Sequence, residues 1–194
     1  MYVVKIGGSL FREGRGIVRY LRDHSEEIEE PIVLVPGGGM FADLVRSIEV
    51  DDETAHWMAI LGMEQYGYYL SSGIIPAFDD FSEERIYMLL PYRLMKERDP
   101  LPHSWDVTSD SIGAWIAREL SAEYIRATNV DGIFVRGELV NRIRASELPE
   151  GATDRFLPKF LEENGMKCAV VNGRYPERII QAMKGIITGT LITP

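Results

Sequence analysis

The chain has 194 residues, enough for one domain that buries roughly 70% of the surface of the unfolded chain. Apolar residues make up 45% and charged residues 26%, and the formal net charge of −9 disfavours binding to nucleic acid or anionic membranes through bulk charge. The sequence has no apolar run of membrane-spanning length, no signal-peptide pattern, and a single cysteine, Cys168, which cannot form an internal disulfide. We therefore expect a cytoplasmic protein with one domain over residues 1–194.

Short apolar runs alternate with longer segments of helical periodicity. In chain order, the pattern predicts a strand at 2–6, a helix at 14–24, a strand at 32–35, helices at 40–47 and 52–70, strands at 74–75 and 88–90, a helix at 109–120, a strand at 124–128, a hairpin at 134–140, a helix at 156–163, a strand at 168–171, a helix at 176–183 and a strand at 185–192. This alternation indicates an α/β protein whose mainly parallel sheet is covered on both faces. Ligands of such sheets bind beyond the carboxyl ends of the strands.

Two glycine clusters lie where such a ligand would bind. Each follows a predicted strand and precedes a predicted helix: the first is Lys5-Ile-Gly7-Gly8-Ser9 and the second is Pro36-Gly37-Gly38-Gly39. Glycine lets the backbone approach a ligand closely, and a helix N-terminus presents free N–H groups to an anion. Two such loops side by side predict sites for two phosphate groups, one from a donor and one from an acceptor. The alternative is that each cluster is only a tight turn.

Several common catalytic arrangements lack their parts in this sequence. The spacing from Gly37 to Ala42 fits a dinucleotide fingerprint, but the position about twenty residues on is Trp57, inside a predicted helix. The sequence contains no Gly-Lys dipeptide, which excludes a Walker loop. The three histidines lack metal-ligand spacing, and there is no Gly-x-Ser-x-Gly elbow. Nicotinamide or flavin chemistry, zinc hydrolysis and a serine triad are therefore disfavoured.

Three further polar segments fall near the same predicted edge of the sheet. They are Thr108-Ser-Asp110 at the start of a helix, Thr128-Asn-Val-Asp131-Gly132 after a strand, and Pro158-Lys159 near the start of another helix. An acidic Asp110 near phosphates would orient lysines or hold Mg²⁺ through water. The alternatives are a helix cap at Asp110, a turn at Asp131 and a surface charge at Lys159.

Phosphoryl transfer needs only a small set of groups, because the protein mainly positions the reactants and neutralises charge. Lys5 and Lys159 would supply positive charge to the transferring phosphoryl group, and backbone N–H groups of the glycine loops would hold its oxygens. An acceptor that is itself a phosphate is already ionised near neutral pH and needs no strong general base. The lack of a histidine near the second glycine cluster fits such an acceptor.

These motifs, in this order, resemble the amino acid kinase superfamily over nearly the whole chain. The matching segments are Lys5-Ile-Gly-Gly-Ser9, Gly37-Gly-Gly39, Thr108-Ser-Asp110, Thr128-Asn-Val-Asp-Gly132, Pro158-Lys159 and Gly189-Thr190. The co-linear set is much more specific than any one segment. The resemblance implies a three-layer α/β/α sandwich with a mainly parallel central sheet. It also implies transfer of the γ-phosphoryl group of ATP, with Mg²⁺, to a carboxylate, carbamate or phosphate.

The resemblance further implies a role for each matching residue. Lys5 and Lys159 would contact the transferring phosphates, and Asp110 would organise both lysines. The remaining residues divide into a phosphate path of Gly7, Gly8 and Ser9, a nucleotide half with Asp131 and Gly132, and an acceptor loop of Gly37, Gly38 and Gly39.

Within the superfamily, three strings are similar to the kinases of methanofuran biosynthesis: Gly37-Gly-Gly-Met-Phe-Ala-Asp43, His56-Trp-Met-Ala59 and Trp105-Asp-Val-Thr-Ser-Asp110. That similarity implies that [5-(aminomethyl)furan-3-yl]methyl phosphate is converted to its diphosphate. Asp43 would then pair with the ammonium group of the substrate, and Trp105 would stack on the furan ring. The alternatives are that Asp43 is a first-turn acid that meets the helix dipole and that Trp105 is a core residue.

Two other functions stay open at this stage. One is a nucleoside monophosphate kinase of the uridylate type, and the other is a non-catalytic ATP-binding storage or regulatory subunit. Retention of Lys5, Asp110 and Lys159 together argues against the second, since binding alone does not require all three. The apolar-rich helix at 52–70 and the resemblance both imply a homo-oligomer with small-molecule substrates. The chain is shorter than many superfamily kinases, and we expect the shortening between Asp131 and Lys159, which leaves the adenine contacts unassigned.

Overall fold

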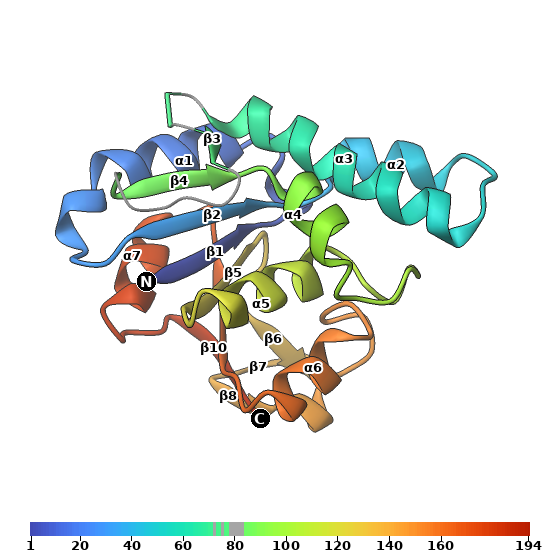
Figure 1. Cartoon of the computed structure of the whole chain (residues 1–194). Coiled ribbons are helices and arrows are strands. Elements are labelled where there is room, and N and C mark those ends of the chain that lie inside the picture. Colours follow the sequence, from blue (N-terminus) through green and yellow to red (C-terminus); the bar gives the residue numbers. More distant parts are fainter. Residues whose placement is uncertain (72, 75, 78–83) are drawn as a thin grey trace.

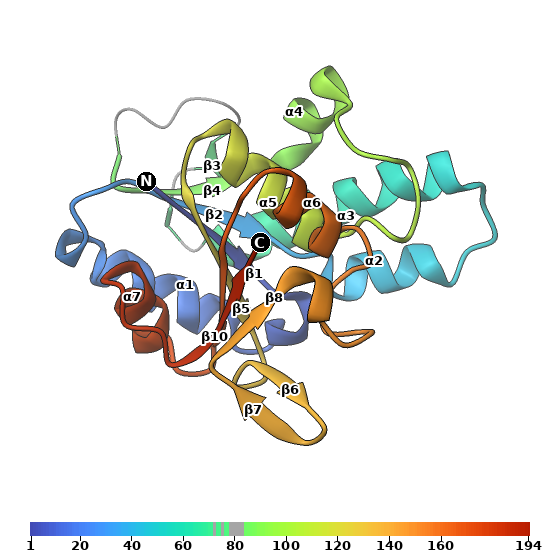
Figure 2. The same ribbon diagram turned by 90° about the horizontal axis from the view of Figure 1, so that it is seen from below.

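A computed structural model describes residues 1–71, 73–74, 76–77 and 84–194. Over these residues a mixed sheet forms the centre of the molecule, with strand order β3-β4-β2-β1-β5-β9-β10-β8 (Figure 1). Its strands are β1 (Tyr2–Ile6), β2 (Ile32–Pro36), β3 (Pro76–Ala77), β4 (Ile86–Leu89), β5 (Glu123–Thr128), β8 (Arg142–Arg144), β9 (Cys168–Asn172) and β10 (Gly189–Thr193). Neighbouring strands pair in parallel except β9 and β10, which are antiparallel. A separate hairpin of β6 (Ile133–Val135) and β7 (Glu138–Val140) projects from the body in Figure 2.

Helices cover both faces of the sheet, as the sandwich prediction requires (Figures 1 and 2). The helices are α1 (Gly14–Asp23), α2 (Gly39–Arg46), α3 (Asp52–Ser71), α4 (Pro91–Arg98), α5 (Ser109–Glu119), α6 (Leu157–Glu163) and α7 (Glu177–Met183). One apolar core lies under α1 and α7, and the other lies under α4, α5 and α6. Helix α3 contributes Ile60 to the second core and Tyr66 to the first, so it crosses the edge where β1 and β2 end.

The alternation of side chains along β1 sets the position of its one charged residue. Val4 and Ile6 are buried in the core beneath α1, while Val3 is buried in the core beneath α5. Because successive side chains point to opposite faces of a sheet, Lys5 emerges on the α5 side. Strand β5 is paired in parallel with β1, and its Arg126 is the register partner of Lys5. Two cations therefore lie side by side beneath the N-terminus of α5.

Most predicted elements are confirmed, including the hairpin around Gly137. Three of the helices and strands given above were not predicted: the two-residue strand β3, the helix α4, which opens with Pro91 and has charged side chains at half of its positions, and the short edge strand β8. The last strand begins at Gly189 and not at 185, because Gly185 has φ +81° and turns the chain after α7. The strand predicted at 74–75 is wrong at Ile74, which lies in a bend, while residue 75 lies outside the described residues.

Candidate active site

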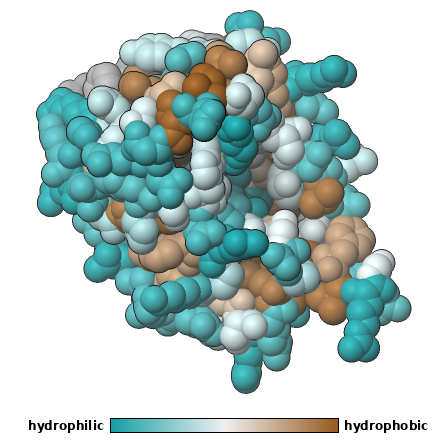
Figure 3. Space-filling view, turned by 90° about the vertical axis from the view of Figure 1, so that its right-hand side faces the viewer, coloured by the Kyte–Doolittle hydropathy of each residue, from teal (hydrophilic) through white to brown (hydrophobic). Residues whose placement is uncertain are grey.

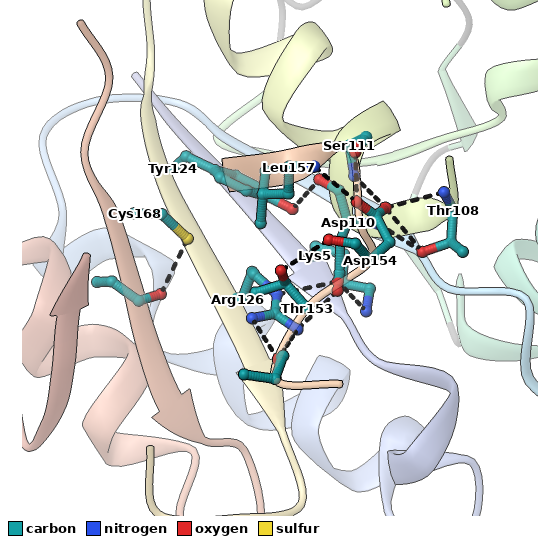
Figure 4. A network of polar contacts seen from close by, with 12 residues as sticks. Lys5, Thr108, Asp110, Ser111, Tyr124, Arg126, Thr153, Asp154, Leu157 and Cys168 are labelled. Atoms are coloured by element: carbon teal, nitrogen blue, oxygen red, sulfur yellow. Dashed lines mark hydrogen bonds and ion pairs between the residues drawn. The ribbon is translucent and has the colours of Figure 1, made fainter. Parts of the chain in front are cut away.

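Lys5, Asp110 and Arg126 form a buried cluster that we call the charge centre (Figure 4). The Lys5 Nζ donates to Asp110 Oδ1 over 2.7 Å. Arg126 binds the same carboxylate with two bonds, from Nε to Oδ1 at 2.9 Å and from one terminal nitrogen to Oδ2 at 2.7 Å. All three side chains are at most 10% exposed. A two-pronged arginine contact on a buried carboxylate fixes both its position and its orientation.

The electrostatics of the charge centre follow from its burial and its pairing. Burial alone would raise the pKa of Asp110, but the charges of Arg126 and Lys5 outweigh burial and hold that pKa well below its usual value. Burial would lower the pKa of Arg126, and Asp110 reverses this and raises it. Asp110 and Arg126 are therefore both ionised at neutral pH. One carboxylate between two cations leaves a net positive charge, which suits an anionic ligand.

Asp154 fixes the helix that carries Asp110. Its carboxylate accepts hydrogen bonds from the backbone N–H and hydroxyl of Thr108 at 2.8 and 2.9 Å. It also accepts from the backbone N–H and hydroxyl of Ser111 at 2.9 and 2.6 Å, and from the N–H of Leu157 at 2.8 Å. One side chain thus satisfies free N–H groups at the first turns of both α5 and α6. It joins the two helices and holds Asp110 over the sheet.

The two glycine loops touch each other backbone to backbone. The N–H of Gly37 donates to the Ile6 carbonyl over 2.8 Å. A Cβ on Gly8 would lie 2.5 Å from the backbone nitrogen of Gly39, a contact that no side chain tolerates. Gly39 has φ +53°, in the left-handed region that favours glycine. Close approach of the loops therefore requires glycine at these positions, and it brings the first turn of α2 beside the end of β1.

Two cavities open at this edge of the sheet, and they meet at Gly8 and Ser9. The helix-side cavity has a volume of about 370 Å³ and lies between α2, α3 and the start of α5. The sheet-side cavity has a volume of about 590 Å³ and lies over β1 and β5, bordered by the 128–134 and 149–153 segments. Lys5, Asp110 and Arg126 line the sheet-side cavity. Figure 3 views the molecule from the right-hand side of Figure 1, where hydrophilic residues surround small apolar groups.

The structure brings most of the predicted site residues to these two cavities. The sheet-side cavity is lined by Lys5, Gly7, Asp110 and Gly132, the helix-side cavity by Gly38, Gly39, Asp43 and Trp105, and both by Gly8 and Ser9. Gly37 lies beneath the loops and lines neither cavity.

Two predicted residues lie apart from the cavities. Asp131 accepts hydrogen bonds from Arg178 at 2.6 Å and from Asn172 at 3.1 Å, which ties its loop to β9 and α7. Lys159 is exposed on α6, with its Nζ 3.7 Å from Glu163 of the same helix. Neither side chain lines the helix-side or the sheet-side cavity.

Asp43 and Trp105 share a partner at the rim of the helix-side cavity. Arg46 donates to Asp43 over 2.8 Å, and its guanidinium lies 4.7 Å from the centre of the Trp105 ring. Trp105 is 38% exposed, so it is not a core residue. In this structure the Arg46 guanidinium covers the face of the Trp105 indole that we expect to stack on a substrate ring.

Sequence reasoning missed Arg126 and Asp154. A signal for Arg126 exists, since a charged residue in an otherwise apolar strand, Tyr124–Thr128, needs a buried partner. Asp154 stands three residues before Leu157, the first residue of α6, and an acidic residue just ahead of a helix is readable from the sequence. Its hydrogen bonds to α5 depend on tertiary structure and leave no local signal.

Within the described ranges, His, Cys, Asp and Glu side chains form no group of three or more that is placed to hold a metal ion. No helix in that part of the chain combines the length and apolar character needed to cross a membrane.

Comparisons with known proteins agree with this geometry. The model of the amino acid kinase family matches residues 1–82. The [5-(aminomethyl)furan-3-yl]methyl phosphate kinase of Methanocaldococcus jannaschii is 36% identical to this chain, over 95% of this chain and 94% of that protein. A uridylate kinase of Methanocella arvoryzae is 31% identical over 44% of this chain and 47% of its own length.

Solved structures show the same fold. The uridylate kinase of Archaeoglobus fulgidus superposes with a TM-score of 0.72 at 21% identity and covers 100% of both chains. The UMP kinase of Bacillus anthracis superposes with a TM-score of 0.71 at 16% identity, over 99% of this chain and 95% of that one. The three-layer sandwich with a mainly parallel sheet is therefore confirmed.

Proposed function

This chain belongs to the amino acid kinase family, and we propose that it transfers the γ-phosphoryl group of ATP to [5-(aminomethyl)furan-3-yl]methyl phosphate. The products are ADP and the corresponding diphosphate. The observation that carries the proposal is the pair of cavities that meet at Gly8 and Ser9, with the charge centre lining the sheet-side cavity. The 36% identity to a kinase of this name over most of both chains supports the acceptor.

In this proposal ATP occupies the sheet-side cavity and the phosphate of the acceptor lies in the helix-side cavity. An oxygen of the acceptor phosphate attacks the γ-phosphorus across the Gly8–Ser9 junction, and the bond to the β-phosphate oxygen breaks, so that ADP keeps the electron pair. A phosphate monoester has its second pKa near 6 and already carries a nucleophilic oxygen at neutral pH. The junction therefore needs no general base.

Lys5 supplies the positive charge nearest the junction. Asp110 and Arg126 hold it there, so the protein does not have to reorganise as charge builds up on the transferring oxygens. A Mg²⁺ ion bound together with ATP would neutralise part of the charge on the phosphates. Both Asp110 oxygens are engaged by cations, so we assign Asp110 to organising Lys5 rather than to holding Mg²⁺.

Lys159 stays a prediction as a second phosphate contact. Its pairing with Glu163 is an exposed i,i+4 contact, worth about 0.3–0.5 kcal/mol, and does not hold the side chain in place. A bound nucleotide with several negative charges offers a stronger partner. Arg126 meanwhile takes the second cation position on Asp110 that the resemblance gives to a lysine.

A uridylate-type nucleoside monophosphate kinase is the second candidate, favoured by uridylate kinase relatives over nearly half of the chain. An ADP-release assay with ATP and Mg²⁺ separates the two candidates. The acceptors are the aminomethylfuran phosphate, UMP, AMP, isopentenyl phosphate and acetylglutamate, with Lys5→Met as the enzyme blank. We expect strong turnover with the furan phosphate alone. Turnover with UMP and none with the furan phosphate would reverse the assignment. If ATP binds but no acceptor gives ADP release, a storage or regulatory subunit would be favoured.

We also propose a cytoplasmic homo-oligomer. Large apolar side chains are exposed on α2 and α3, among them Met40, Leu44, Leu61 and Tyr68, and such surfaces mark protein contacts. The single buried cysteine, Cys168, fits a reducing compartment. Light scattering coupled to gel filtration tests the assembly, and a mass of 22.0 kDa at micromolar concentration would contradict it.

A further inference from the structure

The charged residues of the helix-side cavity are not equally available to a ligand. Arg46 binds Asp43 and also stacks on Trp105. The charges of Arg46 and Asp43 therefore neutralise each other at the rim of the cavity. Asp52 also lines the cavity. Within the described residues, its carboxylate has no hydrogen bond and no ion pair. The cavity therefore keeps one uncompensated negative charge, and Asp52 carries it.

Asp52 lies in the first turn of α3, where the helix dipole favours its charge, but its carboxylate does not cap the helix. An acidic residue in the first turn of a helix commonly caps free N–H groups. In α3 that task is done by Asp51, whose carboxylate accepts from the Thr54 N–H at 2.9 Å and from the Thr54 hydroxyl at 2.7 Å. Asp52 is left free to bind a partner from outside the chain.

His56 lies one helical turn after Asp52 and on the same face of α3. It lines the same cavity and is only 7% exposed, yet its ring nitrogens have no hydrogen-bond partner within the described residues. Its ring is stacked on His103, with 4.4 Å between centroids, and His103 in turn pairs with Asp99 at 2.7 Å. Burial, helped by His103, lowers the pKa of His56 to about 4, so the imidazole is neutral at pH 7 and keeps an acceptor nitrogen.

These two side chains lie away from the glycine loops. Gly62 of α3 packs against the backbone of Phe41 and Ala42, at the loop end of α2. His56 lies six residues before Gly62, about 9 Å along the helix axis, and Asp52 lies one turn farther. A ligand with a phosphate against the loops would extend its other end towards His56 and Asp52.

We propose that Asp52 and His56 form a subsite for a primary ammonium group on the acceptor. The Asp52 carboxylate supplies the charge, and the imidazole of His56 accepts one N–H of the ammonium. Arg46, which stacks on Trp105 and binds Asp43, lines the same cavity. The inference rests on the proposed function, which supplies a phosphate ester with an aminomethyl group at its far end.

Calorimetric binding to the full chain tests the subsite without relying on turnover. The two probes are the aminomethylfuran phosphate and the analogue with methyl in place of aminomethyl. We expect the wild-type chain to bind the amine about 10- to 100-fold more tightly, the range of one charged hydrogen bond. Asp52→Asn should bring this ratio close to 1, and His56→Phe, which keeps the ring stacking, should lower it several-fold. Glu53→Gln is the matched control, since it removes the same charge one residue along α3 and outside the cavity, and it should leave the ratio unchanged.

Each outcome decides the proposal. Equal binding of the two probes by the wild-type chain overturns the subsite. A preference that survives Asp52→Asn and disappears in Asp43→Asn overturns it in favour of Asp43. If Glu53→Gln lowers the ratio as much as Asp52→Asn, the effect is one of general charge. If the ratio depends on Asp52 and the furan phosphate is nevertheless not phosphorylated, the subsite stands and the proposed kinase reaction fails.

Discussion

The two cavities hold their charges in opposite ways. In the sheet-side cavity, Lys5, Asp110 and Arg126 are buried on strands and a helix start and are paired with one another. In the helix-side cavity, the Arg46 and Asp43 side chains are 48% and 73% exposed, and Asp52 has no partner within the described residues. Buried pairs are costly to rearrange, whereas exposed pairs contribute about 0–1 kcal/mol and rearrange readily. Under the proposed function, the rigid centre would serve the phosphoryl transfer and the adjustable wall would select the acceptor.

The largest expected effect comes from disrupting the buried charge centre of the sheet-side cavity. Asp110→Asn leaves Lys5 and Arg126 without the anion that holds them, so we expect kcat to fall by about 10³-fold, the scale of losing a preorganised charge in an active site. Steady-state ADP release measures it, and circular dichroism at the assay temperature checks that the variant is folded. Wild-type turnover in this variant would rule out Asp110 as the organising group.

A smaller loss is expected when only the geometry of the second cation changes. Arg126→Lys keeps a positive charge but cannot form the two-pronged contact with Asp110. We expect kcat to fall about 10- to 100-fold with little change in the KM for ATP, because Arg126 acts through Asp110 and Lys5. Arg174→Lys is the control, since Arg174 pairs with Glu13 away from the cavities. Equal behaviour of the two variants would mean that the two-pronged contact is not needed.

The next effect is on stability and tests how the rigid centre is supported. Asp154→Asn places an amide group opposite N–H donors that the carboxylate satisfies, so we expect a loss of about 2–3 kcal/mol in the free energy of unfolding. Urea titration measures it. Asp106→Asn, which changes an exposed carboxylate 3.6 Å from Arg155, should stay within about 0.5 kcal/mol of the wild type. If Asp154→Asn also lowers the free energy of unfolding by no more than about 0.5 kcal/mol, then contacts other than those of Asp154 hold α5 in place.

The smallest expected effect is on the pH dependence of stability, and it tests the environment of His56 in the helix-side cavity. The pKa of His56 is about 4 in the folded chain and about 6.5 in an unfolded one. As pH falls from about 6.5 to about 4, the unfolded chain takes up a proton that the folded chain does not. The full pKa difference corresponds to about 3 kcal/mol, and solvent in the cavity screens part of it, so we expect folding to lose about 2 kcal/mol. Below pH 4 this contribution stays constant. The free-energy difference between the wild type and His56→Phe, followed from pH 7 to pH 4, should shrink by that amount, and a constant difference would mean that His56 titrates normally.

The sequence was sufficient where local pattern and structure agree. The periodicity of 109–120 and the apolar run at 2–6 predicted α5 and β1, and the glycine clusters predicted the edge at which both cavities open. The contact between Arg126 and Asp110 could not be predicted, because it depends on the register of β1 against β5. The edge strand β8 was missed for a related reason: Arg142–Arg144 pairs with β10, about fifty residues on, and has almost no pattern of its own.

The same limit applies to the acceptor residues. Asp43 and Asp52 are equally acidic in the sequence, and each lies in a predicted helix. Only the structure shows that Arg46 occupies one of them and that Asp51 frees the other from capping α3. Sequence motifs identified the cavity, and side-chain competition within it decides which group is available.

The most direct test of the account is a crystal structure with a non-hydrolysable ATP analogue and the aminomethylfuran phosphate bound together. We predict the nucleotide in the sheet-side cavity, the acceptor in the helix-side cavity, and the two facing phosphates at Gly8 and Ser9 with the Lys5 ammonium in contact. A nucleotide in the helix-side cavity, or facing phosphates that lie away from the Gly8–Ser9 junction, would contradict the account.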